Sequence, residues 1–116
     1  MKEDKAYLQD MLDAICDIEK FIEDMTQDEF CKNKEKQYAV LRALEIIGEA
    51  TKKLGKGLKT KHREITWRDI AGMRDKLIHD YFGVDIDVVW GTVKQDIPVL
   101  KVKVKEIIKE LEPNSS

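Results

Sequence analysis

Apolar residues recur at spacings of three and four along most of the chain, a pattern typical of amphipathic helices. It is clearest over residues 5–25 and 34–54, and Gly55 is expected to stop the second of these helices. Between them, Thr26 and Glu29 have the spacing of a capping box, which predicts a short helical segment. The first half of the chain therefore predicts two long helices and one short helix.

The second half of the chain predicts two more long helices. Thr66 can cap a helix that runs to about Tyr81, and Gly83 would end it. A last helical stretch begins near Asp85, and Pro98 is expected to kink or break it. Amphipathic helices joined by short connections form antiparallel bundles. We therefore expect an all-α fold, an antiparallel up-and-down four-helix bundle with an extra short helix.

Length and composition agree with a single helical domain over residues 1–116. The chain has 116 residues, 42% of them hydrophobic and 38% charged, with only two prolines. The packed core is expected over residues 5–111 and a disordered tail over 112–116. The N-terminus is charged, and no stretch approaches the roughly 18 apolar residues of a membrane span, so the sequence predicts a cytoplasmic protein.

The net charge of −2 argues against a general nucleic-acid coat, but it hides a basic segment between residues 52 and 68. Such a segment could hold a polyanion such as RNA, or it could be a solvated, lysine-rich connector. Its basic residues are Lys52, Lys53, Lys56, Lys59, Lys61, Arg63 and Arg68.

The run "RDKLIHDYF", which starts at Arg74, concentrates the chemistry of the chain. On a helix that advances 100° per residue, Arg74 and Tyr81 fall within about 20° of each other. His79 lies about 140° from Arg74 and close to Asp75, four residues before it. It also occupies the last turn, where the helix dipole and nearby carboxylates favour the imidazolium, so His79 suits a proton donor near neutral pH.

An arginine and a histidine without a metal suit RNA cleavage by the adjacent 2′-hydroxyl. Arginine offsets the charge of the phosphorane, and imidazoles move protons. Acid and base roles usually need two groups, whereas one chain offers a single histidine in this run; a two-fold dimer would supply the second. The alternative interpretation of Arg74 and His79 is an exposed helix face with local ion pairs.

Metal binding has little support in the sequence. Cys16 and Cys31 form no CxxC pair, so no zinc site is indicated. Glu45 and Glu49 share a helix face with Arg42, and this pattern is explained more simply by ion pairs within the helix than by a metal site. The sequence therefore predicts neither a metal nor another cofactor.

Several blocks of the chain resemble one known family. The motif "RDKLIHDYF" is similar to the Arg-x4-His-x-Tyr signature of the HEPN superfamily in its HepT-like branch. "LRALEIIGEATKKL", "ITWRDIAGMRDKLIHDYFGVD" and "VVWGTVKQDIPVL" resemble further blocks of that branch. The resemblance implies a homodimeric helical bundle and a metal-independent endoribonuclease, whose Arg74 and His79 are catalytic and face those of the second subunit.

The resemblance also implies a partner. Members of this branch are toxins of type VII toxin–antitoxin pairs, and their antitoxin is a minimal nucleotidyltransferase of the MNT class. The antitoxin is thought to silence the toxin by transferring AMP to the motif tyrosine, here Tyr81. Asp75 stands where the branch often has asparagine, and we expect it to orient His79.

Two other functions remain open. The chain could be a non-catalytic HEPN subunit that binds nucleotide or docks a nucleotidyltransferase, with Arg74 and Tyr81 only contacting phosphate. It could also be a structural dimerisation bundle in which the polar motif forms a buried ion-pair network.

Overall fold

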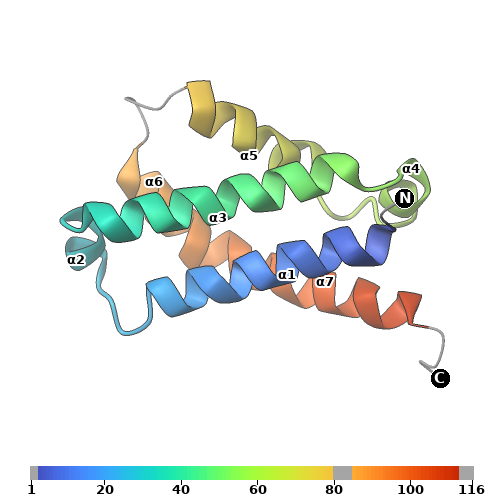
Figure 1. Ribbon diagram of the computed structural model, residues 1–116, viewed down its shortest axis with the longest axis horizontal. Coiled ribbons are helices and arrows are strands. Elements are labelled where there is room, and N and C mark those ends of the chain that lie inside the picture. Colours follow the sequence, from blue (N-terminus) through green and yellow to red (C-terminus); the bar gives the residue numbers. More distant parts are fainter. Residues whose placement is uncertain (1–2, 80–84, 113–116) are drawn as a thin grey trace.

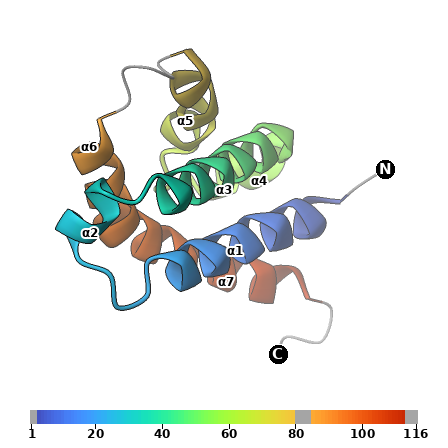
Figure 2. The ribbon, with the colours of Figure 1, turned by 60° about the vertical axis from the view of Figure 1, so that its left-hand side comes forward.

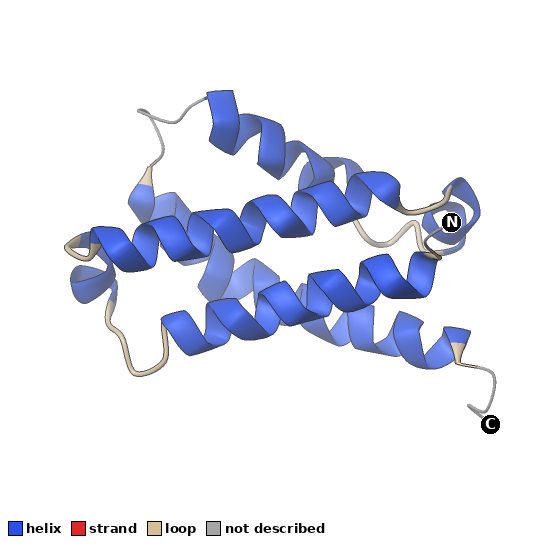
Figure 3. Cartoon of the chain, viewed as in Figure 1, coloured by secondary structure: helices blue, strands red, loops and turns tan. Residues whose placement is uncertain are grey.

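The computed structural model describes residues 3–79 and 85–112, and within residues 74–79 it describes the backbone alone. Every regular element in these ranges is helical (Figure 3). Four helices are long: α1 (Asp4–Phe21), α3 (Lys34–Lys53), α5 (Trp67–His79) and α7 (Ile97–Leu111). The shorter elements are α2 (Gln27–Cys31), α4 (Lys56–Lys61), α6 (Ile86–Gly91) and a π-helical turn, η1 (Thr92–Asp96).

The long helices form a bundle in which α1 and α3 make the most extensive contact. Helix α1 runs antiparallel to α3 and also packs against α7, while α5 packs on the opposite flank of α3 (Figures 1 and 2). The short helix α2 joins α1 to α3 and contacts α6. The predicted all-α bundle is confirmed for the described residues.

The core is built from the apolar stripes that the sequence predicts. Leu8, Met11, Ile15 and Ile18 of α1 are fully buried, as is Ile47 of α3. Each such side chain contributes roughly 1.5–3 kcal/mol by leaving water. No helix in the described ranges is long and apolar enough to cross a membrane.

Helix α1 is shorter than its apolar pattern predicts. The pattern continues to Met25, but the helix ends at Phe21. Asp24 adopts the left-handed conformation, with φ of 58°, and so reverses the chain. Ile22 is nevertheless buried and Met25 packs partly on the core, which is why a periodicity argument extends the helix too far.

The last helical stretch is not one uniform α-helix, because α6 and α7 are separated by η1, which ends two residues before Pro98. The chain passes from α6 through η1 into α7, and Pro98 lies in the first turn of α7. A proline inside an α-helix has no N–H and collides with the carbonyl four residues earlier. The wider π-helical turn at Thr92–Asp96 changes the hydrogen-bond pattern just before the proline, so the helix continues.

Two side chains fix the ends of α3. At its start, Gln37 Nε2 donates to the carbonyl oxygens of Phe30 at 2.9 Å and Cys31 at 3.0 Å. At its end, Asp4 Oδ1 accepts the backbone N–H of Gly55 at 2.9 Å, which ties α1 to the start of α4. The predicted stop near Gly55 is confirmed.

Candidate functional site

Helix α5 carries the Arg-x4-His motif, and its first turn is fixed by several hydrogen bonds. The indole of Trp67 donates to the carbonyl oxygen of His62 at 3.0 Å. The carbonyl oxygen of Thr66 accepts the backbone N–H groups of Asp69 and Ile70 at 3.0 and 3.1 Å. Trp67 itself is buried. The start of the helix is therefore tied both to the loop before it and to the core.

The backbone of α5 is helical through His79, so Arg74 and His79 lie in its C-terminal half. At 1.5 Å per residue they are about 7.5 Å apart along the helix axis. The side chains of Arg74, Asp75 and His79, and the whole of Tyr81, lie outside the described residues.

Helix α3 separates α5 from α1. The Lys36 ammonium lies 5.7 Å from the Phe21 ring centroid, and the Lys53 ammonium lies 5.9 Å from that of Tyr7, which marks the side of α3 that faces α1. Gly48 is buried within α3. It lies about 140° from Lys53 around the helix, toward the flank on which α5 packs.

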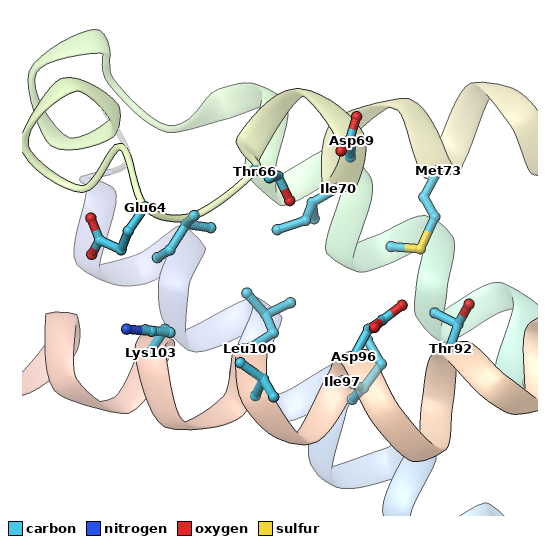
Figure 4. Close-up of a pocket in the computed structure, with 12 residues that line it drawn as sticks. Glu64, Thr66, Asp69, Ile70, Met73, Thr92, Asp96, Ile97, Leu100 and Lys103 are labelled. Carbon is cyan, nitrogen blue, oxygen red and sulfur yellow. The ribbon is translucent and has the colours of Figure 1, made fainter.

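A groove runs between the first half of α5 and the opposite wall formed by η1 and α7 (Figure 4). Its volume is about 470 Å³, within the range of small-ligand sites. Figure 4 shows Met73 on the α5 wall facing Thr92 on η1. Met73 is the residue before Arg74, so the groove opens beside the start of the motif. Apolar side chains line much of it: Ile65, Ile70, Met73, Ile97, Val99 and Leu100.

The polar residues around this groove are mainly acidic. Glu64, Asp69 and Asp96 line it, with Lys103 as the single basic residue among the side chains that the structure describes there. Figure 4 shows the Asp96 carboxylate pointing into the groove. Three carboxylates against one ammonium repel a phosphate backbone. The described part of the groove is therefore a poor path for RNA.

The basic segment lies at the other end of α5 from the motif. Lys52 and Lys53 end α3, while Lys56, Lys59 and Lys61 belong to α4. Figure 1 shows α4 beside the start of α5, away from the end that carries His79. Arg63 belongs to the loop before α5 and Arg68 to its first turn. Arg68 is the member of this segment nearest to Arg74, about 9 Å along the helix axis.

Part of this positive charge is paired within the fold. Lys53 lies 4.0 Å from the carboxylate of Glu49. Lys61 donates a hydrogen bond to Glu110 near the end of α7, and this bond holds the pKa of the Glu110 carboxyl below its usual range. These contacts favour the connector interpretation for Lys53 and Lys61, whereas Arg68 remains well placed beside the motif.

The second histidine of the chain has a structural position. His62 Nδ1 lies 3.5 Å from the Glu64 carboxylate, and Nε2 lies 3.6 Å from Glu110, so the ring bridges the loop and α7. Its side chain is only 14% exposed. No group of three His, Cys, Asp or Glu side chains among the described residues has the arrangement of a metal site. His79 is therefore the one histidine of this chain on the same helix as Arg74.

Comparison with known proteins adds the family to this geometry. The family model described as "HepT-like: Ribonuclease HepT-like" matches residues 11–107, which include all of α5. The chain belongs to the ribonuclease HepT-like family. The matched region begins within α1 and ends within α7, so it includes most of the bundle.

Two relatives of the HepT-like chain match it along nearly their full lengths. "Putative RNase MJ0125" of Methanocaldococcus jannaschii is 51% identical over 108 residues, which cover 93% of each chain. "Probable ribonuclease HepT" of Thermococcus cleftensis is 52% identical over 105 residues, 90% of this chain and 96% of the relative. No solved structure shows significant similarity to this HepT-like chain.

Proposed function

We propose that this HepT-like protein is a metal-independent endoribonuclease, with Arg74 and His79 as its catalytic residues. The observation that supports this most directly is the position of both residues on one helix, α5, inside the region matched by the family. The names of the relatives, which describe ribonucleases, point to RNA as the substrate.

The proposed reaction uses the 2′-hydroxyl of the RNA as nucleophile. A neutral His79 takes the 2′-hydroxyl proton while this oxygen bonds to the adjacent phosphorus. The guanidinium of Arg74 stabilises the negative charge of the phosphorane. The bond from phosphorus to the 5′-oxygen then breaks, and a protonated imidazole gives its proton to that oxygen. The products are a 2′,3′-cyclic phosphate and a 5′-hydroxyl end.

This reaction needs an acid and a base, and His62 is held between two carboxylates elsewhere in the fold. We therefore propose a homodimer in which the partner subunit's His79 supplies the second imidazole. Within each subunit, Asp75 lies four residues before His79 on α5. Its carboxylate would orient the His79 imidazole of the same chain by accepting a hydrogen bond from one ring nitrogen.

The same proposal includes control by a toxin–antitoxin partner. A minimal nucleotidyltransferase would transfer AMP from ATP to Tyr81, and the added phosphate would then occupy Arg74 and exclude RNA. Among the basic residues, Arg68 is best placed to hold RNA near the motif, because the others lie farther from Arg74 (Figure 1).

The test is cleavage of a mixed RNA pool in excess EDTA by unmodified protein. We expect the parent to cleave and to leave 2′,3′-cyclic phosphate ends, and Arg74→Ala and His79→Ala each to lose about 100-fold or more in rate. His62→Gln is the matched control, because it removes the other imidazole; it should keep cleavage below its own unfolding temperature.

The rival function is a non-catalytic subunit that docks a nucleotidyltransferase. The observation in its favour is the apolar, acid-rimmed groove beside Met73, which suits a protein surface better than RNA. A folded, unmodified parent that binds the nucleotidyltransferase and cleaves no RNA would replace the nuclease proposal with this one.

A further inference from the structure

Tyr38 is exposed on the outer side of α3. Its exposed fraction is 53%, whereas each of the other aromatic residues in the described ranges is buried or partly buried. No hydrogen bond or ring contact to another described residue involves its side chain. A phenol ring presented to solvent in this way is available to stack on a flat partner.

Arg42 lies one helical turn after Tyr38, so the two side chains are neighbours on the same side of α3. The side chain of Arg42 is 66% exposed, and its Nη1 lies 3.2 Å from Glu45 Oε2. An exposed pair of this kind contributes about 1 kcal/mol or less. The guanidinium can therefore exchange this carboxylate for a phosphate at little cost.

This part of α3 lies at the same end of the molecule as the motif. Helix α2, which precedes α3, contacts α6 through hydrogen bonds from Gln27 and Cys31 to Asp87. Helix α6 is the element that follows α5 in the structure, and α5 runs antiparallel to α3 in Figures 1 and 2. The first half of α3, which holds Tyr38 and Arg42, therefore lies at the same end of the bundle as the C-terminal end of α5, where the helix stops at His79.

From these relationships we infer that Tyr38 and Arg42 form a binding site for single-stranded RNA, with a base stacked on the phenol ring and a phosphate on the guanidinium. The inference rests on the proposed ribonuclease function. Together, a ring that stacks on a base and a guanidinium that binds the adjacent phosphate would hold one nucleotide beside the scissile bond. The described lining of the groove beside Met73 is rich in carboxylates, and α4 lies beside the start of α5, away from His79 (Figure 1).

The test measures binding of a short, fluorescently labelled, single-stranded 2′-O-methyl oligonucleotide, which has no free 2′-hydroxyl and cannot be cleaved. Tyr38→Ala should weaken binding about five-fold or more, and Tyr38→Phe should stay within about two-fold of the parent, because stacking needs the ring and not the hydroxyl. Arg42→Gln should weaken binding and flatten its dependence on salt. Lys109→Gln, a charge-matched change near the end of α7, should have no effect beyond about two-fold.

An abasic position in the oligonucleotide locates the stacking contact. At one position, loss of the base should weaken binding to the parent but not to Tyr38→Ala, because the two changes remove the same contact. Equal binding of Tyr38→Ala and the parent would overturn the inference. So would a change in subunit stoichiometry in Tyr38→Ala, measured by light scattering, because it would assign this face to a dimer interface.

The outcome separates this site from the ribonuclease proposal. If the parent binds the oligonucleotide through Tyr38 but cleaves no RNA, the binding site stands and the catalytic proposal fails. If the parent cleaves RNA and Tyr38→Ala cleaves with an unchanged KM, the binding site alone fails.

Discussion

The indole nitrogen of Trp67 donates a hydrogen bond to the backbone carbonyl oxygen of His62 at 3.0 Å. The imidazole of His62 in turn lies between Glu64 and Glu110. The first residue of α5 is thus connected through one loop residue to the end of α7. Because the same helix holds Arg74 and His79, the contacts at its start determine where the motif is presented.

Replacing Trp67 by Phe should therefore lower the free energy of unfolding by about 1 kcal/mol or somewhat more. The substitution keeps an aromatic ring in the core but removes one of two donors to the His62 carbonyl oxygen, which keeps the backbone N–H of Ile65 at 3.2 Å. The measurement is the midpoint of urea unfolding at constant m-value. An unchanged midpoint would show that the hydrogen bond contributes nothing to the start of α5.

A second prediction concerns the buried amide of Gln37. Gln37→Leu should cost about 1–2 kcal/mol, because it removes the side-chain donor to the carbonyl oxygens of Phe30, which keeps the N–H of Asn33, and of Cys31. Gln9→Leu is the matched control, since Gln9 is exposed and bonds only Asp13 on its own helix. That change should stay within about 0.5 kcal/mol. Equal midpoints for the two variants in urea would contradict the role assigned to Gln37.

The periodic apolar residues made the bundle predictable, but they could not show where a helix stops. Ile22 and Met25 contact the core from a non-helical turn, so they prolong the pattern beyond Phe21. The reversal at Asp24 has no glycine to signal it. Pro98 correctly marked a change in the last helix, yet the π-helical turn that accommodates it depends on hydrogen bonds that sequence spacing does not encode.

The candidate site was predictable to the extent that it is local. Arg74 and His79 are five residues apart, so their place on one helix follows from the sequence. The acidic groove does not, because Glu64, Asp69 and Asp96 come from a loop, α5 and η1. Nor does the structural position of His62, which depends on Glu110 at the far end of the chain.

The Cys31 thiol provides a test of the contact between α2 and α6. It is exposed and donates to Asp87 Oδ1 at 3.2 Å, and this hydrogen bond is the main cause that raises the pKa of Cys31. Asp87→Asn should therefore lower that pKa and speed alkylation of Cys31 by iodoacetamide several-fold near pH 8. Asp28→Asn, a weaker neighbour of the same thiol, should change the rate much less. The rate is followed by mass spectrometry, and equal rates in the parent and Asp87→Asn would contradict the contact.

The same contact has a defined dependence on pH. The pKa of Cys31 is higher in the folded protein than in the unfolded chain. The protonated thiol therefore stabilises the folded state fully below the unfolded pKa, and this stabilisation is lost as the pH rises through the folded pKa. The pKa of Asp87 is lowered, chiefly by the hydrogen bond from Gln27 and then by that from Cys31. The stabilisation from the charged Asp87 carboxylate is present above the pKa of an unfolded aspartate and is lost as the pH falls through the lower folded pKa. The urea midpoint of the parent, compared with that of Asp87→Asn, should therefore decrease both at low pH, where Asp87 is protonated, and at high pH, where Cys31 is deprotonated.

The last prediction concerns silencing by AMP transfer. In the proposed reaction the phenol oxygen of Tyr81 attacks the α-phosphorus of ATP, gives up its proton and displaces pyrophosphate. Tyr81→Phe keeps the ring and loses that oxygen, so it should gain no AMP from the nucleotidyltransferase and should keep cleaving RNA in its presence. Tyr38→Phe is the matched control, because Tyr38 is an exposed tyrosine on α3, outside the motif, and this variant should still gain AMP. The measurement is the intact-protein mass before and after incubation with ATP and the nucleotidyltransferase. The RNA cleavage rate is measured on the same samples. A parent protein that gains AMP and cleaves RNA at its former rate would show that this modification does not silence the enzyme, because the added phosphate would then leave Arg74 free for RNA.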